Sequence, residues 1–443
     1  MMKVIKFSED NFFEELDKYI KVDSISKPEV ISSVRDILED VKSNGDEALL
    51  RYTKKFDNFE ATTESIRVTR EEIDAAFSAC DKTLMEALET AFKRVRAYHE
   101  RQIPVNEKYE DDLGFTLGWK WNPVESVGLY VPGGKAFYPS SVIMNAVPAI
   151  VAGVRRIAMA VPAPDGILNP VVLVAARIAG VKEIYKIGGA QAVAALAYGT
   201  KTIEPVVKIV GPGNAYVAEA KRQVFGFVGI DTIAGPSEIL VIADSENEPR
   251  WIAADLLSQA EHDVDARSFL ITDNEIFAQK VQKEIDGLLE RMGRKETAKQ
   301  SLNNNGLVII VRDIEDATII ANRIAPEHLE ICTKNPENIS KKITNAGAIF
   351  LGPYTPEPIG DYIAGPSHVL PTMGSAKFSS GLSVLDFLKR TSMIKCSEGA
   401  LRAVADKTIR LANEEKLGAH ALSVKLRLEA KPSKGELSVQ NKK

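Results

Sequence analysis

The chain has 443 residues, of which 45% are hydrophobic and 26% are charged, and its formal net charge is -5. This length allows roughly two to four folded units with well-buried cores. The mild acidic balance excludes the basic surface typical of nucleic-acid binding, and no apolar run reaches the length of about eighteen residues that a membrane span needs. The N-terminal sequence lacks the apolar core of a signal peptide, so we expect a cytoplasmic protein.

Residues 1–110 carry apolar side chains at spacings of three and four, which predicts amphipathic helices. From about residue 124, apolar runs rich in β-branched residues alternate with helical patterns. We predict strands at 155–162, 182–189, 205–213, 237–245, 267–273, 306–311, 329–333 and 347–352. We predict helices between them at 169–180, 190–200, 214–224, 251–262 and 314–324. This alternation is typical of parallel sheets that helices cover on both faces.

The sequence therefore predicts an α/β protein with two parallel-sheet domains. We place the first domain at residues 124–236 and the second at residues 237–380. A helical N-terminal region, residues 1–123, precedes them, and a mostly helical tail, residues 381–443, follows them.

Three segments of the first predicted domain run from an apolar strand into a glycine turn. In parallel sheets, ligands bind beyond the carboxyl ends of the strands, where glycine allows the backbone to approach them closely. Gln191 and Asn214 follow two of these turns and are placed to hydrogen-bond a nucleotide, while Tyr130 could stack on a ring or bond a ribose. None of the turns has the G-x-G-x-x-G fingerprint, and each alone is typical of a plain strand–helix connection.

Candidate metal ligands are scattered along the chain. Gln259 and His262 share one helix face, although a lone Q-x-x-H is usually structural. Asp361 follows a Pro-Ile-Gly turn, His368 lies shortly after it, and His420 closes the segment EKLGAH. One Gln, two His and one Asp would form the mixed nitrogen and oxygen shell that suits zinc. The three cysteines are far apart, which argues against a cysteine-based zinc site.

Glu327 and His328 are adjacent after a proline, at the start of a predicted strand. A glutamate can deprotonate water, and a histidine can accept and return a proton near neutral pH. Oxidising an alcohol to an acid requires both tasks. The alternative is a surface pair at the end of a helix. Cys332, on the same strand, could attack an aldehyde, but its apolar neighbours favour core packing.

Taken together, at least seven motifs in order resemble the histidinol dehydrogenase family, from about residue 20 to residue 427. The motifs are GLYVPGG at 128–134, GGAQAVAALAYGT at 188–200, GPGNAYVAEAKRQV at 211–224, AGPSEILVIAD at 234–244, DLLSQAEHD at 255–263, IAPEHLE at 324–330 and EEKLGAH at 414–420. The resemblance implies the final step of histidine biosynthesis, in which L-histidinol is oxidised through L-histidinal to L-histidine with two NAD and a bound zinc. It also implies that both sheets are incomplete Rossmann-like relatives of the dinucleotide-binding fold.

The resemblance further implies a role for each matching residue. The implied zinc ligands, which also contact the substrate, are Gln259, His262, Asp361 and His420. Glu327 would activate water and His328 would transfer protons. The implied substrate contacts are Ser237, His328, Glu415 and, close by, His368. The implied NAD contacts are Tyr130, Gln191 and Asn214.

Members of the family that this chain resembles are homodimers in which the tail of one subunit completes the site of the other. Glu415 and His420 would then serve the opposite subunit. One departure is Ser367, which stands where many relatives have asparagine, and it leaves the surroundings of His368 uncertain.

Three other functions compete with this interpretation. A sister enzyme on the same scaffold could oxidise another primary alcohol, such as a sulfonated diol, but Glu415 and His368 both suit an imidazole. A zinc hydrolase would have no use for the glycine turns with Gln191 and Asn214. A catalytically silent binding protein would not need the acid–base pair Glu327 and His328.

Overall fold

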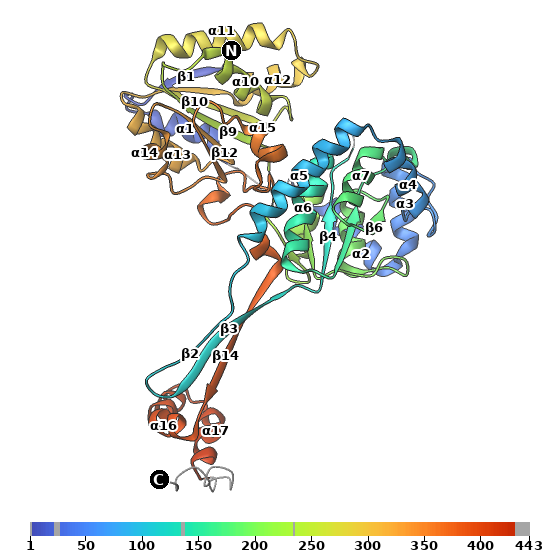
Figure 1. Ribbon diagram of the computed structural model, residues 1–443, viewed down its shortest axis with the longest axis vertical. Helices are drawn as coiled ribbons and strands as arrows, with labels where there is room; N and C mark the ends of the chain where they lie inside the picture. The colour runs from blue at the N-terminus through green and yellow to red at the C-terminus, as the bar shows by residue number, and fades with distance from the viewer. Residues whose placement is uncertain (1, 22–26, 134–137, 234, 430–443) are drawn as a thin grey trace. The chain divides into compact units, whose positions relative to one another are not determined.

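The computed structural model describes residues 2–21, 27–133, 138–233 and 235–429. Its contacts divide the chain into two compact units. The first combines Met1–Ile103 with Pro123–Phe387, and the second combines Pro104–Asn122 with Leu388–Lys443. Figure 1 shows the two large sheets of the first unit and the long strands of the second. The division predicted at residues 123, 236 and 380 stays a prediction, and Gly134, Ala234 and the last residues of the tail lie outside the described residues.

The first sheet is parallel and has the strand order β6-β5-β4-β7-β8. Its strands are β4 (Ser126–Tyr130), β5 (Arg156–Ala160), β6 (Glu183–Tyr185), β7 (Lys208–Val210) and β8 (Gly229–Ile230). Counted along this part of the chain, the order is 3-2-1-4-5, which is the Rossmann order without its last strand. The order reverses between β4 and β7, and such a switch point is where ligands bind in open parallel sheets.

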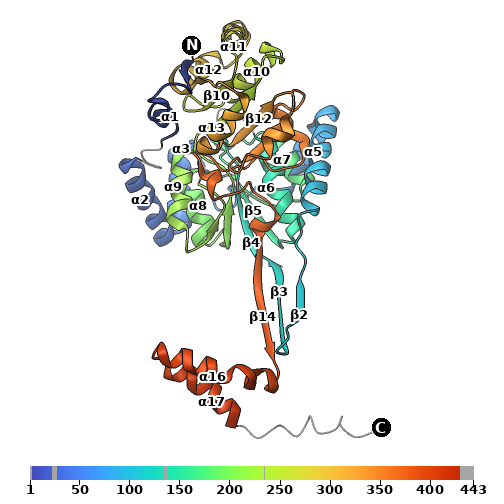
Figure 2. The same cartoon turned by 90° about the vertical axis from the view of Figure 1, so that its left-hand side faces the viewer.

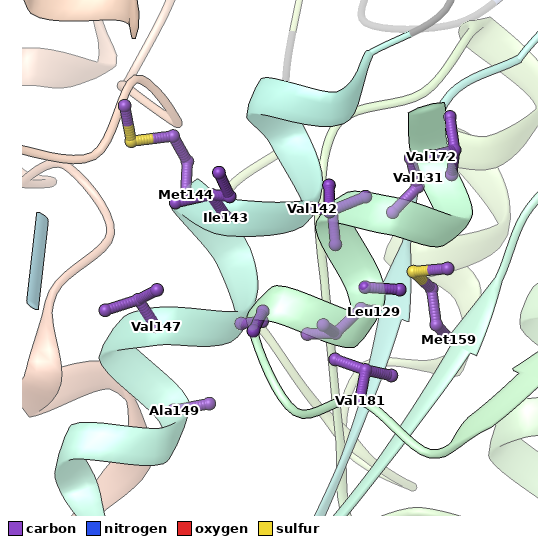
Figure 3. Packing of buried hydrophobic residues seen from close by; sticks show 14 of the residues in the cluster. Leu129, Val131, Val142, Ile143, Met144, Val147, Ala149, Met159, Val172 and Val181 are labelled. Atoms are coloured by element: carbon purple, nitrogen blue, oxygen red, sulfur yellow. The ribbon is translucent and has the colours of Figure 1, made fainter. Parts of the chain in front are cut away.

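Helices cover both faces of the first sheet. They are α2 (Pro28–Asn44), α3 (Asp46–Asp57), α4 (Arg70–Ala79), α5 (Lys82–Glu100), α6 (Pro139–Ala152), α7 (Pro170–Ile178), α8 (Gly189–Tyr198) and α9 (Ala215–Val224). Buried side chains of α4 to α7 pack on one face, where Val127 and Leu129 of β4 point, and those of α2, α3, α8 and α9 pack on the other (Figure 2). Figure 3 shows Leu129 and Met159 of the strands lying near Val142 of α6. The N-terminal helices therefore complete the core of this sheet.

The second sheet is also parallel, with the order β1-β11-β10-β9-β12-β13. Its strands are β1 (Lys3–Lys6), β9 (Glu238–Ala243), β10 (Arg267–Thr272), β11 (Leu307–Ile310), β12 (His328–Cys332) and β13 (Ala348–Leu351). Strands β9 to β13 repeat the order 3-2-1-4-5, so the prediction of two incomplete Rossmann-like sheets is confirmed. The prediction of a helical N-terminal region, residues 1–123, is wrong for β1, which extends this sheet beside β11, and for β2 (Glu107–Glu110) and β3 (Phe115–Pro123).

Two helix layers cover the second sheet as well. Its helices are α1 (Phe12–Ile20), α10 (Pro249–Ala260), α11 (Glu275–Leu289), α12 (Lys295–Asn305), α13 (Ala317–Ile324) and α14 (Pro336–Ser340). Buried side chains of α10, α11 and α12 pack on one face, and those of α1, α13 and α14 pack on the other. After β13, the short helix α15 (Glu357–Ile359) runs into a π-helical turn, η3 (Gly360–Ala364). This segment carries Asp361.

The second unit combines a small sheet with two helices. The sheet has the order β14-β3-β2, and β2 (Glu107–Glu110) pairs antiparallel with β3 (Phe115–Pro123). The prediction of a helical tail is confirmed for α16 (Glu398–Glu414) and α17 (Gly418–Glu429). It is wrong for Leu388–Cys396, which forms strand β14. Across both units, the described helices include none that is long and apolar enough to cross a bilayer.

Candidate active site

Glu327 and His328 lie at the amino end of β12, and both are buried. Both are held by Glu238, the first residue of the neighbouring strand β9. The Glu238 N–H donates to Glu327 Oε2 over 2.9 Å, and His328 Nδ1 lies 3.1 Å from the Glu238 carbonyl oxygen. The surface pair that the sequence left open as an alternative is therefore wrong.

The second ring nitrogen of His328 faces Asp361, with Nε2 lying 3.3 Å from Asp361 Oδ1. An acceptor lies beside each nitrogen, so this environment favours the protonated, positively charged ring. Burial works to lower the pKa of His328, but the negative charges of Glu327 and Asp361 outweigh it and raise this pKa to about 10. Burial raises the pKa of Glu327 to about 8, against the opposing charge of His328. Burial also works to raise the pKa of Asp361, but the hydrogen bond from His328 holds it down at about 2.

Glu357 is a site residue that the sequence analysis missed. Its side chain is only 2% exposed, and Oε1 lies 3.8 Å from His328 Nε2. His328, Glu357 and Asp361 each offer a metal-ligating atom, and these atoms lie within 4.8 Å of one another. The spacing of Glu357 and Asp361 in EPIGD, four residues apart and so on one helical face, was a signal that could have found this residue.

A polar stripe on α10 faces the same region. Asp255, Ser258 and Gln259 follow the three- and four-residue spacing of one helix face, and His262 continues this spacing in the turn after α10 ends at Ala260. On β12, His328, Glu330 and Cys332 point to the side that α10 covers, while the intervening residues join the opposite core. The Ser258 hydroxyl donates to Glu357 Oε2 over 3.2 Å, so a hydrogen bond connects α10 to the Glu357 carboxyl group.

Gln259 and His262 fit a cation. Gln259 is 1% exposed, and its Oε1 has no hydrogen-bond partner among the described residues. Such an oxygen is costly to bury unless a ligand satisfies it. Burial lowers the pKa of His262, so its imidazole is neutral and able to donate a lone pair. The charge of Asp361 works to raise this pKa, and the charge of His328 works to lower it further.

Two buried acids, Asp255 and Glu330, lie close to Glu357. Glu330 Oε1 accepts the Glu357 backbone N–H over 2.6 Å. Burial raises the pKa of Asp255 to about 6, and burial together with the charge of Asp255 raises the pKa of Glu330 well above its ordinary value. Cys332 belongs to the adjacent hydrophobic cluster, and burial raises the pKa of its thiol, which keeps it protonated. The prediction that Cys332 is a core residue is confirmed.

His368 lies beside Asp361 but has both ring nitrogens paired. Nδ1 lies 3.1 Å from the Asp361 carbonyl oxygen, and Nε2 lies 3.1 Å from the Ser141 hydroxyl of α6. Burial lowers the pKa of His368, so a neutral ring donates from Nδ1 and accepts at Nε2. The Ser367 hydroxyl donates to the Met144 carbonyl oxygen over 3.2 Å. The departure at Ser367 therefore leaves His368 connected to α6 and to the segment of Asp361.

The remaining predicted substrate and metal contacts lie in different places. Ser237 is half-buried and immediately precedes β9, next to Glu238. Glu415 follows the last residue of α16, and His420 lies in the first turn of α17. Both are exposed in the second unit. Their meeting with the residues of the first unit stays a prediction.

The predicted nucleotide contacts gather around the carboxyl ends of β4 and β7. Tyr130 ends β4, and its hydroxyl accepts the Gly189 N–H over 3.0 Å. Gln191 is buried in α8, and neither atom of its amide has a hydrogen-bond partner in the described part of the chain. Asn214 Oδ1 caps α9 by accepting two backbone N–H groups. Two helix N-termini and an unpaired buried amide are groups that suit a nucleotide, and the assignment of these three residues to NAD stays a prediction.

Comparisons with known proteins agree with this geometry. The histidinol dehydrogenase family model matches residues 21–428. The chain is 60% identical over 400 residues to histidinol dehydrogenase from Agrobacterium fabrum, covering 90% of this chain and 93% of that protein. It is 54% identical over 428 residues to the Brucella abortus enzyme, covering 97% and 100%. The crystal structure of histidinol dehydrogenase from Elizabethkingia anophelis superimposes with a TM-score of 0.91 at 37% identity, covering 97% of this chain and 98% of that one. The chain belongs to the histidinol dehydrogenase family.

Proposed function

We propose that the protein oxidises L-histidinol through L-histidinal to L-histidine and reduces two NAD in the process. The observation that carries this proposal is the buried pair Glu327 and His328, fixed on Glu238 and facing Asp361. The family membership supplies the substrate, because the relatives that match over nearly the whole chain are named for histidinol.

The reaction needs two hydride transfers with one hydration between them. In the first step the alcohol loses a hydride to NAD and a hydroxyl proton to the neutral form of His328, which gives the aldehyde and the imidazolium that Glu327 and Asp361 stabilise. Glu327 then takes a proton from a water molecule as the water oxygen attacks the aldehyde carbon, and protonated His328 returns its proton to the carbonyl oxygen, which gives the hydrated aldehyde. In the second step the hydrate loses another hydride and another proton, which gives the carboxylic acid. With a pKa of about 8, Glu327 can both accept and release a proton near neutral pH.

Gln259, His262, Asp361 and His420 would hold a zinc ion. Its contribution would be to anchor the imidazole and the amine of histidinol, since nitrogen donors suit zinc, whereas NAD accepts the hydride. The unpartnered oxygen of Gln259 and the neutral ring of His262 support this donor set. Ser237, His368 and Glu415 would contact the substrate. His368, whose ring is paired on both sides, would act chiefly by holding the segment of Asp361.

Tyr130, Gln191 and Asn214 would bind NAD. The amide of Gln191 supports this assignment best, because a buried amide without partners is stabilised by a ligand that supplies them. The Tyr130 hydroxyl accepts the Gly189 N–H, so its own proton is free to be donated to the nucleotide. Asn214 uses its oxygen on α9, which leaves its amide NH₂ for the ligand.

We also propose a homodimer in the cytoplasm, with the tail of one subunit completing the site of the other. The second unit supports this assembly because it leaves large apolar side chains exposed. Ile394 of β14 is 74% exposed, and the exposed leucines of α16, the following turn and α17 are Leu411, Leu417, Leu422 and Leu426. Apolar surface gathered on one small unit is typical of a protein interface.

The test is turnover of purified, zinc-loaded protein with L-histidinol and NAD, in which NADH and histidine are counted together. We expect two NADH for each histidine. One NADH with release of the aldehyde would overturn the second step. If a protein that binds both zinc and NAD forms no NADH, its substrate is a different primary alcohol, and amino and sulfonated alcohols would be tried next.

A further inference from the structure

A buried ion pair lies beside the glycine turn that follows β7. Lys221 of α9 and Asp231, just after β8, have side chains that are 2% and 3% exposed and form an ion pair with each other. Neither residue is among the predicted contacts of NAD, metal or substrate. Burying two charges is unfavourable unless each finds partners for its remaining hydrogen-bonding groups, so those partners show what the pair does.

The pair holds both peptide groups of one glycine. The Lys221 ammonium donates to the Gly211 carbonyl oxygen over 2.9 Å, and Asp231 Oδ2 accepts the Gly211 N–H over 2.7 Å. Lys221 also donates to the Thr232 carbonyl oxygen over 3.1 Å. The lysine therefore donates hydrogen bonds to Gly211 and Thr232, and its charge is paired with Asp231. The ion pair fixes the glycine on its donor side and its acceptor side at once.

Gly211 occupies the point where β4 and β7 diverge. Its φ of +112° is a conformation that favours glycine, and a Cβ at this position would lie 2.1 Å from the Tyr130 carbonyl oxygen. The backbone of this turn therefore packs directly on the end of β4, with no room for a side chain at Gly211. It leads through Pro212 and Gly213 to Asn214, which caps α9. Lys221 lies about two turns further along that helix. Its side chain therefore connects the second turn of α9 to the glycine turn that precedes the helix.

Stability alone is a weak explanation for this arrangement, because apolar side chains of similar volume usually replace a buried ion pair without loss of stability. The same sheet offers a contrast. Arg156 and Glu183 form an ion pair with side chains 21% and 17% exposed, and Arg156 also donates to the carbonyl oxygens of Glu204 and Pro205. That pair connects β5 and β6 to a loop, and within the described structure Arg156 makes no hydrogen bond or ion pair with the turns at the switch point.

We propose that Lys221 and Asp231 are positioning residues for the nucleotide. They fix the Gly211 turn and the N-terminus of α9 in the geometry that receives NAD, while the substrate pocket around His328 does not depend on them. This inference rests on the proposed NAD-linked function.

The test compares NAD binding by calorimetry, and KM for NAD against KM for histidinol, in wild type and Lys221→Met. We expect the Kd and KM for NAD to rise about 10- to 100-fold, since a displacement of about 1 Å in positioned groups has effects of this size. The KM for histidinol and the zinc content should stay within about twofold. A merely structural role would lower the melting temperature without this split.

A double variant keeps the inference testable if the single variant folds poorly. Lys221→Met with Asp231→Leu removes both charges at similar volume and leaves no unpaired charge, so we expect its melting temperature to lie above that of the single variant while NAD binding stays weak. Arg156→Met is the control, and it should lose stability but bind NAD as wild type does. If both Lys221 variants bind NAD as tightly as wild type, the inference is wrong but the proposed function stands. Absence of NAD binding in wild type would overturn the proposed function and the inference with it.

Discussion

His328 Nε2 lies 3.3 Å from Asp361 Oδ1, so the proposed proton carrier and a proposed metal ligand share a hydrogen bond. A carboxylate has lone pairs on both oxygens and can hold a second positive group besides the imidazolium. With these proposed roles, proton transfer and metal binding would be coupled through Asp361. The Glu357 carboxyl lies 3.8 Å from the same nitrogen, and burial raises its pKa to about 8.

The charge of His328 predicts how the metal-free protein responds to pH. A group whose pKa is higher in the folded chain stabilises the fold below its unfolded pKa, and this effect is lost as the pH rises through the folded value. The pKa of His328 rises from 6.5 to about 10, and that of Glu327 rises from 4.5 to about 8. We expect the melting temperature of metal-free protein to fall between pH 6.5 and 10 by a few degrees, since about 1 kcal/mol shifts such midpoints by roughly 2–4 °C.

The matched control for this pH dependence is His328→Asn, which removes the titrating ring. Its melting temperature should change less steeply over the same pH range, measured by calorimetry with chelator present. Equal slopes in the two proteins would contradict the charged state of His328.

The sequence predicted the fold well where strands are long and apolar. The eight strands predicted between residues 155 and 352 all occur, because buried parallel strands read as continuous apolar runs. It failed at β1, where two lysines flank Val4 and Ile5, and at β14, whose residues are almost all exposed. A strand at the edge of a sheet, or one in a largely exposed unit, lacks the apolar pattern that identifies a strand.

The site was predictable for residues that stand in motifs and less so for those that support them. Glu327, His328 and Asp361 could be named from the sequence, but only the fold places them around Glu238. Glu357 was missed because its role depends on the side that α15 presents to β12. The polar stripe of α10 resembles an ordinary exposed helix face until Glu330 is found buried beneath it.

Glu327→Gln should separate the two oxidations. Glutamine keeps the shape and can still accept the Glu238 N–H, but it cannot take a proton from water. We expect alcohol oxidation to continue while the aldehyde step slows by about 10²–10⁴-fold, the usual contribution of a general base. Rapid mixing with histidinol should give one NADH per site and aldehyde that a hydrazine reagent traps. Two NADH per histidine at the wild-type rate would exclude Glu327 as the base.

Gln259→Leu should separate metal binding from stability. The Gln259 oxygen is buried without a partner in the described structure, and such a group destabilises a fold by about 1–3 kcal/mol. We therefore expect metal-free Gln259→Leu to melt at or above the wild-type temperature. The zinc content of the variant after dialysis should fall. Its affinity for zinc should drop by about 10- to 100-fold or more, because removing even a residue that only hydrogen-bonds to a metal ligand has an effect of this size. Elemental analysis with undiminished zinc would rule out Gln259 as a ligand.

Mixed dimers can decide which subunit uses His420. We expect His420→Asn alone to lose zinc and activity while staying dimeric, because His420 is exposed at the start of α17 and asparagine keeps its polarity. Lys425→Asn on the same helix is the control and should keep both zinc and activity. When His420→Asn and Glu327→Gln chains are co-expressed, a tail that serves the opposite subunit restores one intact site in each mixed dimer. Random pairing then gives about a quarter of wild-type turnover from two inactive variants. If His420 served its own chain, both sites of every mixed dimer would stay defective, and the mixture would be as inactive as its parents.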